Sequence, residues 1–310
     1  MKDTKYNPRI TVVGIGGVGG YVAAMLANHY AGVTVIARGK RKETIEENGL
    51  VLHSDYKGEI RANPFEVAEP GSPMPTQDFV FVCVKNYSLS DALEEMSPYI
   101  GEHTVIVPVM NGVDPGSRIR SRFSGGTVVD SLIYIVSYTL PDSSIVQEGK
   151  FAQIRIGIMH ADSKEQDAVN HVQKLLFEAG IDCVSSGDIE AEIWKKFILN
   201  CAYNVLTTYY NEPIGMLRTD QKKSAEYETL VKEAYQMALS KGVHVTDTDI
   251  SAILRRFYLE LEEDATSSLQ RDYHSGRKTE LETFSGYLVK EAEKMGIELP
   301  LTTALYEKLR

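Results

Sequence analysis

Three polar residues recur at a spacing of four in one of the most apolar stretches of the chain. Lys196, Asn200 and Asn204 lie in WKKFILNCAYNVLT, residues 194–207, where most other side chains are apolar. A four-residue step drifts by roughly 40° around an α-helix, so these side chains share one slowly turning stripe. A helix that is apolar on its other faces is normally buried. Buried ammonium and amide groups need polar partners, so the stripe indicates a polar ligand beside it.

The same spacing would suit a surface lysine beside two asparagines that cap turns, and the stretch alone leaves both readings open. If Lys196 is partly desolvated, its pKa falls toward neutral pH, which suits a general acid. No nucleophile triad, zinc-protease signature or P-loop competes with this chemistry, and the seven histidines show no ligand spacing. We therefore expect acid–base chemistry without a metal.

A glycine-rich turn near the start of the chain could hold a ligand that faces this lysine. Gly14, Gly16 and Gly19 fit G-x-G-x-x-G between an aliphatic run, 10–13, and a small-residue helix, 21–30. This context is the dinucleotide-binding fingerprint: the glycines allow a tight turn, a close pyrophosphate and close helix packing. The helix N-terminus then faces the phosphate charge. The alternative is a glycine-rich turn without a ligand.

The end of the next strand, VTVIAR, favours NADP over NAD. An acidic residue there would bind the ribose 2′-hydroxyl of NAD, but the chain continues as ARGKRK and the first acid is Glu43. Arg38 is placed to meet a 2′-phosphate, and Lys40, Arg41 and Lys42 add positive charge. A solvated basic loop is the alternative.

Two further residues follow strand-like apolar runs. Lys85 comes after DFVFVCV, residues 78–84, and Asn111 comes after the run 104–109. Ligands of a doubly wound sheet gather at the carboxyl ends of its strands, so both residues are candidate cofactor contacts. Each would also serve as an ordinary turn residue.

The order of elements predicts an α/β protein with two domains. We expect residues 1–188 to form an NADP-binding, Rossmann-type doubly wound sheet, and residues 189–310 to form an all-helical domain that binds substrate and carries the catalytic residues. The runs 127–136 and 151–158 are expected to be antiparallel or edge strands, because no helix-length segment separates them. Helical periodicity over 279–295 predicts one continuous helix there.

Composition excludes several classes of protein. The 310 residues have a formal net charge of −10, which argues against general nucleic-acid or anionic-membrane binding. Three separated cysteines offer no metal spacing and suit a reducing compartment. No stretch has the roughly 20 apolar residues of a membrane helix, and the N-terminus lacks a signal peptide. We expect a soluble, cytoplasmic protein.

Taken together, these features predict a dehydrogenase that holds its substrate between a nucleotide domain and a helical domain. Hydride transfer to a ketone leaves a developing alkoxide, which needs a proton. Lys196 is the best-placed cation in the sequence to donate that proton.

The chain resembles the ketopantoate reductase (2-dehydropantoate 2-reductase) family over nearly its whole length. The resemblance rests on the ordered combination of GIGGVGG, VKNYS, MNGVD, WKKFILNCAYN and SSLQRDYHSGRKTELE. It implies reduction of 2-dehydropantoate to (R)-pantoate with NADPH, a step toward pantothenate and coenzyme A. It also leaves the oligomeric state open, with a homodimer among the options.

The resemblance implies a role for each matching residue. Lys196, rather than Lys195, would be the catalytic lysine, supported by Glu280. The expected substrate contacts are Asn200, Asn204 and Ser268, and the expected cofactor contacts are Arg38, Lys85 and Asn111. Glu280 has an alternative role at a helix N-terminus, because Thr279 and Glu282 have the spacing of a capping box. Ser268 would alternatively be a first-turn serine.

The chain departs from the family at positions near these motifs. Leu269 stands where methionine is frequent, Gln147 where histidine is common, Val205 where proline is common, and Ser285 where asparagine often occurs. None removes a catalytic group, although several could shape the substrate pocket. Two other functions stay open: a related reductase of another small 2-oxo acid, and a nonenzymatic NADP-responsive binding protein.

Overall fold

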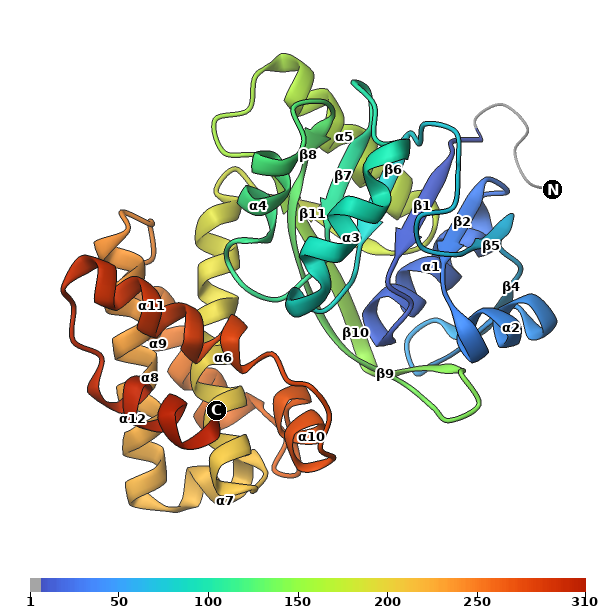
Figure 1. Ribbon diagram of the computed structural model, residues 1–310. Coiled ribbons are helices and arrows are strands. Elements are labelled where there is room, and N and C mark those ends of the chain that lie inside the picture. Colours follow the sequence, from blue (N-terminus) through green and yellow to red (C-terminus); the bar gives the residue numbers. More distant parts are fainter. Residues whose placement is uncertain (1–6) are drawn as a thin grey trace. The chain divides into compact units, whose positions relative to one another are not determined.

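The computed structural model describes residues 7–310, which divide into two compact units (Figure 1). The first unit ends at Ile189 and the second spans Glu190–Arg310, so the division falls at the start of the long helix α6 (Ile189–Tyr210). The expected cofactor residues all belong to the first unit. The expected catalytic and substrate residues all belong to the second unit.

A six-stranded parallel sheet forms the centre of the first unit. Its strands have the order β5-β2-β1-β6-β7-β8, and every neighbouring pair is parallel. The chain leaves β1 toward one edge and later returns to its other side at β6, which makes the space between β1 and β6 the topological switch point. The strands are β1 (Ile10–Val13), β2 (Val33–Ile36), β5 (Glu66–Ala68), β6 (Phe79–Val82), β7 (Val105–Pro108) and β8 (Thr127–Val128).

Helices cover both faces of this sheet, which confirms the predicted doubly wound fold. Neighbouring residues of β1 divide between the two sides: Val12 belongs to a core with α1, and Val13 belongs to a core with α3. Strands β1, β2, β6 and β7 are buried at every position, as their continuous aliphatic runs predict. The helices of this unit are α1 (Gly17–His29), α2 (Gly39–Asn48), α3 (Leu89–Met96), α4 (Pro115–Arg122) and α5 (Ser163–Glu178).

A second sheet packs on the far side of α1. Its order is β11-β10-β3-β4, with β9 antiparallel along β10, so the antiparallel pair predicted from the sequence is confirmed. Helix α1 lies between the two sheets and is buried from Gly19 to Ala27. The sequence did not predict the hairpin of β3 and β4. The strands are β3 (Leu50–Ser54), β4 (Gly58–Ala62), β9 (Asp130–Thr139), β10 (Ile145–Gly157) and β11 (Asp182–Ser185).

The second unit is all-helical, as predicted. The expected helix over 279–295 is interrupted: a 3₁₀ turn at Leu281–Thr283 is followed by Phe284, which has φ −98° and ψ −93°, before α11 begins. A π-helical turn, Arg256–Glu260, extends α9. The other helices are α7 (Ile214–Thr219), α8 (Gln221–Ser240), α9 (Asp247–Arg255), α10 (Ser268–His274), α11 (Ser285–Met295) and α12 (Pro300–Leu309).

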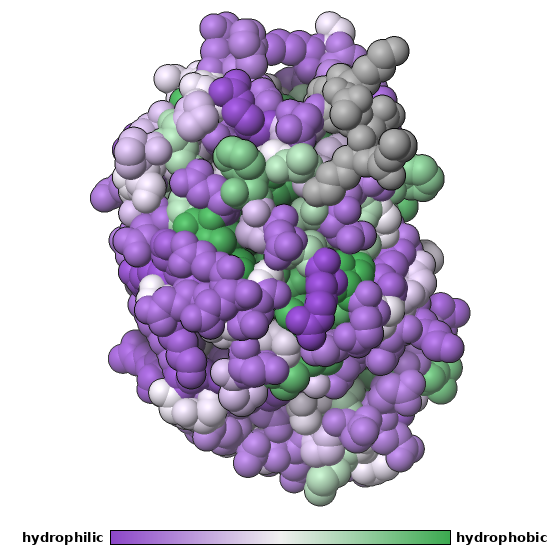
Figure 2. All heavy atoms as spheres, turned by 90° about the vertical axis from the view of Figure 1, so that its right-hand side faces the viewer, coloured by the Kyte–Doolittle hydropathy of each residue, from purple (hydrophilic) through white to green (hydrophobic). Residues whose placement is uncertain are grey.

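The surface of the first unit is polar where α2 lies. Seen from the right-hand side of Figure 1, that face carries mainly hydrophilic side chains, with hydrophobic patches between them (Figure 2). Within residues 7–310, no helix has both the length and the apolar character that crossing a membrane requires.

Candidate functional site

The glycine-rich turn joins β1 to α1 with the geometry of a phosphate-binding turn. Gly14 has φ +92°, and a Cβ there would lie 2.8 Å from Val84 Cγ1. A Cβ at Gly19 would lie 1.9 Å from the Gly14 carbonyl oxygen. Gly16 is the N-cap of α1, and a Cβ there would meet no atom within 4 Å. Two glycines are thus required by close packing, while Gly16 borders open space at a helix N-terminus, where a phosphate fits.

The first turn of α2 concentrates positive charge at the end of β2. Arg38 is the N-cap, and the first turn contains no acidic residue. Cations are unfavourable at the positive end of a helix dipole, so this arrangement favours an anion beside it. The side chains of Arg38 and Lys40 are exposed and form no hydrogen bond or ion pair with another of residues 7–310. Lys42 forms an ion pair with Glu46 instead.

Arg41 does not join the exposed basic group that its sequence position suggested. Its Nη1 donates to the carbonyl oxygen of Ser143, in the turn between β9 and β10. Burial lowers the pKa of Arg41, opposed by the nearby Asp142 carboxylate. Of the four basic residues in RGKRK, only Arg38 and Lys40 are therefore directed to solvent without a partner in the described chain.

The loops after β6 and β7 are tied together at the carboxyl edge of the sheet. Asn86 follows Lys85 and donates from Nδ2 to the carbonyl oxygen of Asn111, at 2.6 Å. Arg118 of α4 donates to Asn86 Oδ1 at 3.2 Å. Asn86 is 8% exposed, so these bonds fix a buried junction. The sequence indicated Lys85 and Asn111 but not Asn86 or Arg118, whose roles depend on contacts between distant segments.

Helix α6 is held in the second unit by an aromatic cluster. The rings of Trp194 and Phe197 have centroids 5.4 Å apart, and Phe197 meets Tyr287 of α11 at 5.7 Å. Phe197 also stacks on Phe284, just before α11, at 6.4 Å. Because Trp194 and Phe197 are three residues apart, they share one face of α6. That packing sets the rotation of the helix and hence the direction of Lys196.

Lys196 and Glu280 interact in this setting. Burial lowers the pKa of Lys196 to about 8, while the charge of the Glu280 carboxylate opposes that shift by raising it. Glu280 is 4% exposed and immediately precedes the 3₁₀ turn that leads into α11. A desolvated ammonium group beside a buried carboxylate is an arrangement that suits proton transfer near neutral pH.

The neighbouring Lys195 has the opposite electrostatic behaviour. It forms ion pairs with Glu192 and, at 3.4 Å, with Asp249 of α9. Partial burial by itself lowers the pKa of Lys195, but the two carboxylates outweigh it and the net pKa is raised. Lys195 therefore links α6 to α9.

The remaining polar residues of the stripe meet the first turn of α10. Asn204 is 4% exposed; its Nδ2 donates to the Asn200 carbonyl oxygen at 3.2 Å, and its Oδ1 accepts from the Leu269 amide at 3.5 Å. Ser268 is the first residue of α10, directly before that amide. The structure thus brings Asn200, Asn204 and Ser268 together on two helices.

Hydrogen bonds bear on the two alternative roles that the sequence raised for Glu280 and Ser268. The capping box of Thr279 and Glu282 is absent, because the Glu282 carboxylate accepts from Tyr306 and Lys290 instead. Ser267, not Ser268, caps α10: its Oγ accepts from the Gln270 amide at 3.0 Å. Ser268 is nevertheless a first-turn residue of α10, as its alternative role expected, and Glu280 precedes the 3₁₀ turn without a side-chain cap.

Gln147, one of the departures from the family, is an interior residue of the second sheet. It is 0% exposed; its Oε1 accepts from Ser54, and its Nε2 donates to the carbonyl oxygens of Glu148 and Gly149. These bonds hold the irregular segment of β10, where the pairing with β9 shifts register. Gln147 shapes the sheet of the first unit and does not line a substrate pocket there.

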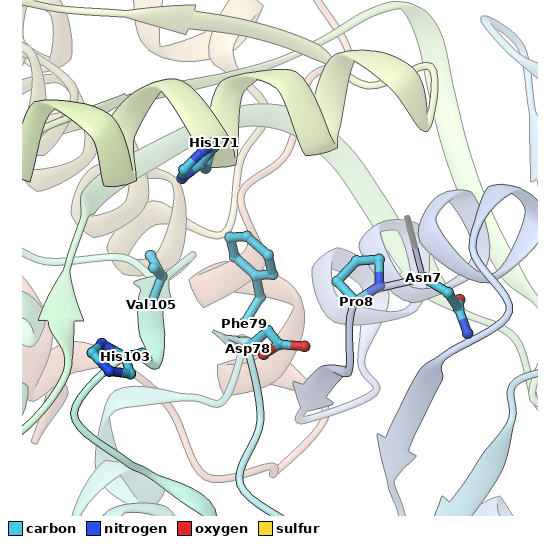
Figure 3. Close-up of a pocket in the computed structure, with 7 residues that line it drawn as sticks. All are labelled: Asn7, Pro8, Asp78, Phe79, His103, Val105 and His171. Carbon is cyan, nitrogen blue, oxygen red and sulfur yellow. The ribbon is translucent and has the colours of Figure 1, made fainter. Parts of the chain in front are cut away.

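A separate cavity of about 340 Å³ lies at the opposite, amino ends of the strands. Its polar lining residues are Asn7, Asp78, His103 and His171, and Figure 3 shows the Asp78 carboxylate turned toward Pro8, away from His103. Asp78 Oδ2 accepts from the Arg9 amide at 2.8 Å. Residues 7–310 contain no group of three or more His, Cys, Asp and Glu side chains that could hold a metal ion.

A parallel sheet with a phosphate-binding turn, followed by a helical unit with a buried lysine and glutamate, defines a two-domain oxidoreductase. Comparison with known proteins gives the family. Residues 10–161 match the model described as ketopantoate reductase PanE/ApbA, and residues 188–310 match the model of the ketopantoate reductase PanE/ApbA C terminal. The chain belongs to the ketopantoate reductase family.

Individual relatives match along most of their length. The chain is 27% identical to the uncharacterized oxidoreductase YkpB of Bacillus subtilis (strain 168), covering 97% of this chain and 98% of that one. It is 30% identical to a 2-dehydropantoate 2-reductase of Mesorhizobium japonicum, covering 76% and 77%. The crystal structure of 2-dehydropantoate 2-reductase from Porphyromonas gingivalis W83 is 27% identical, with TM-score 0.82 and 98% and 99% coverage.

The same fold also occurs with another named activity. The ternary structure of D-mandelate dehydrogenase with NADH and anilino(oxo)acetate has TM-score 0.86 and covers 97% of this chain and 96% of that one. Its sequence identity is 19%, so the likeness concerns the fold. Structures with this fold therefore carry more than one named activity.

Proposed function

We propose that this chain reduces 2-dehydropantoate to (R)-pantoate with NADPH, a reaction that serves pantothenate and coenzyme A synthesis. The observation that carries the proposal is Lys196, whose pKa is lowered by burial to about 8 beside the buried Glu280. Membership of the ketopantoate reductase family supports the reaction class. Relatives named 2-dehydropantoate 2-reductase support the substrate.

Reduced nicotinamide, when bound, supplies a hydride to the keto carbon. Lys196 Nζ donates the proton that the developing alkoxide oxygen requires, so that the ketone gains one hydride and one proton. A pKa of about 8 leaves Lys196 protonated at neutral pH while making it a stronger acid than an ordinary lysine. Glu280 opposes complete loss of that proton, because its negative charge stabilises the ammonium form.

The polar stripe and the first turn of α10 are the proposed substrate contacts. Asn200, Asn204 and Ser268 would hold the carboxylate and the terminal hydroxyl of the substrate. Asn204 contacts α10 through Oδ1, and its side-chain nitrogen carries two N–H groups. One N–H group donates to the Asn200 carbonyl oxygen, so the other would be the donor to substrate. The first turn of a helix also favours a carboxylate electrostatically.

NADPH is the proposed cofactor, and the residues of the first unit suit it. Gly14, Gly16 and Gly19 would accommodate the pyrophosphate at the N-terminus of α1. Arg38 would bind the 2′-phosphate, because it caps α2 where NAD-binding proteins place an acidic residue. Lys85 and Asn111 would complete the contacts from the carboxyl ends of the sheet.

A related reductase of another 2-oxo acid is the second candidate. It is favoured by the fold shared with a D-mandelate dehydrogenase bound to NADH and by the relative described only as an uncharacterized oxidoreductase. The same lysine, glutamate and asparagines would act on any 2-oxo acid, since the reacting groups are identical.

Steady-state kinetics on a panel of 2-oxo acids separates the two candidates. The panel contains 2-dehydropantoate, 2-oxoisovalerate, pyruvate and phenylglyoxylate, each measured with NADPH and with NADH. We expect the highest kcat/KM for 2-dehydropantoate with NADPH. A much higher kcat/KM for another acid would support the second candidate. Tight NADPH binding without oxidation by any acid would indicate a binding protein.

A further inference from the structure

The hairpin of β9 and β10 lies directly on the first turn of α1. A Cβ at Gly17 would come within 2.5 Å of the Ser137 carbonyl oxygen, and a Cβ at Gly20 within 2.5 Å of Ile145 Cγ1. Gly17 and Gly20 are three residues apart and share one face of the helix. The dinucleotide fingerprint does not require them. Contact with the hairpin therefore explains why these two positions are glycine.

The turn of this hairpin is rigidly bonded and presents one carbonyl group to α2. Leu140 and Ser144 close the turn, and Asp142 Oδ1 accepts from both the amide and the hydroxyl of Ser144. Ser143 has φ +72°, a left-handed conformation that costs a non-glycine residue about 1 kcal/mol. The strained residue is the one whose carbonyl oxygen accepts from Arg41.

Arg41 connects three elements but leaves part of its guanidinium unused. It comes from the first turn of α2, donates to the hairpin through Nη1, and places Nη2 3.6 Å from the position of a Cβ on Gly20. Its Nε and Nη2 are buried without a hydrogen-bond partner among the described residues. Buried unpaired donors on a cation are costly, which indicates that the position serves more than packing.

The surroundings of this guanidinium favour an added negative charge. Arg41 lies against the first turn of α1 and within the first turn of α2, and the N-termini of both helices are positive. The nearby carboxylate is Asp142, in the hairpin turn. A pyrophosphate on the glycine-rich turn would compensate the excess positive charge.

We propose that Arg41 is a positioning residue for the pyrophosphate of the dinucleotide, acting by clamping the β9–β10 hairpin onto the phosphate-binding turn of α1. The inference rests on the proposed nicotinamide dinucleotide cofactor. Two arginines in one short segment then have different roles. Arg38 binds the 2′-phosphate of NADPH, and Arg41 positions the pyrophosphate that NADPH and NADH share.

Binding titrations with both dinucleotides test this division. Arg41→Met keeps the aliphatic stem but removes the charge and the bond to the hairpin, so we expect the Kd values for NADPH and NADH to rise by a common factor of about ten. Arg38→Ala should raise the Kd for NADPH much more than that for NADH. Arg61→Met removes an exposed arginine from β4 and should leave both Kd values unchanged.

Hydrogen exchange of the cofactor-free protein tests the clamp itself. Arg41→Met should accelerate exchange of the Leu140 and Ser143 amides, which close the hairpin turn. If Arg41→Met fails to fold, Gly20→Ala provides a second route, because the added methyl group would push Ile145 and the hairpin away without changing any charge. It should also weaken both dinucleotides equally.

Three outcomes would overturn the inference. Unchanged Kd values in Arg41→Met would exclude a positioning role, and loss confined to NADPH would make Arg41 a ligand of the 2′-phosphate. In both cases wild-type protein binds a dinucleotide and the proposed cofactor stands. Failure of the wild-type protein to bind either dinucleotide would overturn the proposed cofactor and the role of Arg41 together.

Discussion

Lys195 and Lys196 are adjacent on α6, yet their ammonium groups have opposite surroundings. Lys195 is paired with two carboxylates, and its pKa is raised; Lys196 is desolvated, and its pKa falls to about 8. Adjacent helical residues point about 100° apart. Lys195 can therefore pair with Asp249 of α9 while Lys196 points into a desolvated environment. The difference gives two kinds of mutational effect at neighbouring positions.

Lys196→Met should abolish most of the activity without unfolding the protein. Loss of a general acid costs roughly 10²–10⁴ in kcat. The substitution also leaves the buried Glu280 carboxylate without its cation, so the melting temperature should fall while the protein stays folded. Steady-state kinetics and thermal unfolding of the same preparation measure both effects.

Lys195→Met is the matched control for that substitution. It removes the ion pairs with Glu192 and Asp249 and should cost about 1 kcal/mol of stability or less. Its kcat should stay within a few-fold of wild type. If instead Lys196→Met retained a fifth or more of wild-type kcat, another group would be the acid.

The pH dependence of reduction should report Lys196 directly. The acid must be protonated, so kcat should be level below about pH 7 and fall as pH rises through about 8. Glu280 raises the pKa of Lys196. Glu280→Gln should therefore move the fall in kcat to lower pH, because the neutral amide no longer stabilises the ammonium form.

The pH profiles of wild type and Glu280→Gln are best measured with saturating substrate and cofactor. Under those conditions kcat reports the bound enzyme rather than binding. An unmoved profile in Glu280→Gln would mean that the carboxylate does not act through Lys196. A shift to higher pH would contradict the direction of the interaction.

The sequence indicated candidate site residues on one helix, but not the hydrogen-bonded neighbours of candidates in other segments. Lys196, Asn200 and Asn204 follow from spacing on one helix, which local periodicity reveals. Asn86 and Arg118, which fix the loop beside Asn111, depend on contacts between segments far apart in the chain. The bond from Arg41 to the Ser143 carbonyl oxygen was missed because it also joins segments far apart in the chain.

At the scale of elements, α12 is held by a side chain from another helix. Its N-cap, Leu299, offers no side-chain cap. Glu233 of α8 is 8% exposed and accepts from the Leu301 amide at 2.9 Å and from the Thr302 amide at 2.8 Å. A carboxylate at this position also suits the positive end of the helix.

Glu233→Ala should destabilise the second unit by about 2–4 kcal/mol, because buried donors at the start of α12 lose their acceptor. Urea unfolding measures the change in the free energy of unfolding. Glu233→Gln retains one carbonyl acceptor and should lose less. A loss below about 0.5 kcal/mol in Glu233→Ala, the size of a neutral surface substitution, would show that water replaces the carboxylate.

Long apolar patterns in the sequence predicted the main helices and strands well, but they did not predict the local irregularities. The buried parallel strands and the helical second unit follow from hydrophobic runs and helical periodicity. The hairpin of β3 and β4 was missed because most of β4 is exposed and lacks such a run. The break at Phe284 was missed because its neighbours keep helical spacing while packing on Phe197 overrides it.

At the scale of the whole molecule, the two units should respond differently to cofactor. The single tryptophan, Trp194, lies in the second unit and is 3% exposed, so its fluorescence reports unfolding there. NADPH at 100 times its Kd should stabilise the unit that binds it by about 2.7 kcal/mol.

Urea titrations followed by two signals measure this difference. We expect NADPH to raise the midpoint of the far-ultraviolet circular dichroism transition more than the midpoint of Trp194 fluorescence. Equal shifts of both midpoints would show that the two units unfold as one cooperative body.

The lowered pKa of Lys196 also makes its amine a nucleophile. At pH 7.5 a group of pKa 8 is about one quarter unprotonated, whereas a lysine at 10.5 is unprotonated at about one part in a thousand. Amine-acylating reagents and aldehydes small enough to reach it should therefore label Lys196 ahead of ordinary lysines. Protection from such labelling would report how completely the site is filled, without any measurement of turnover.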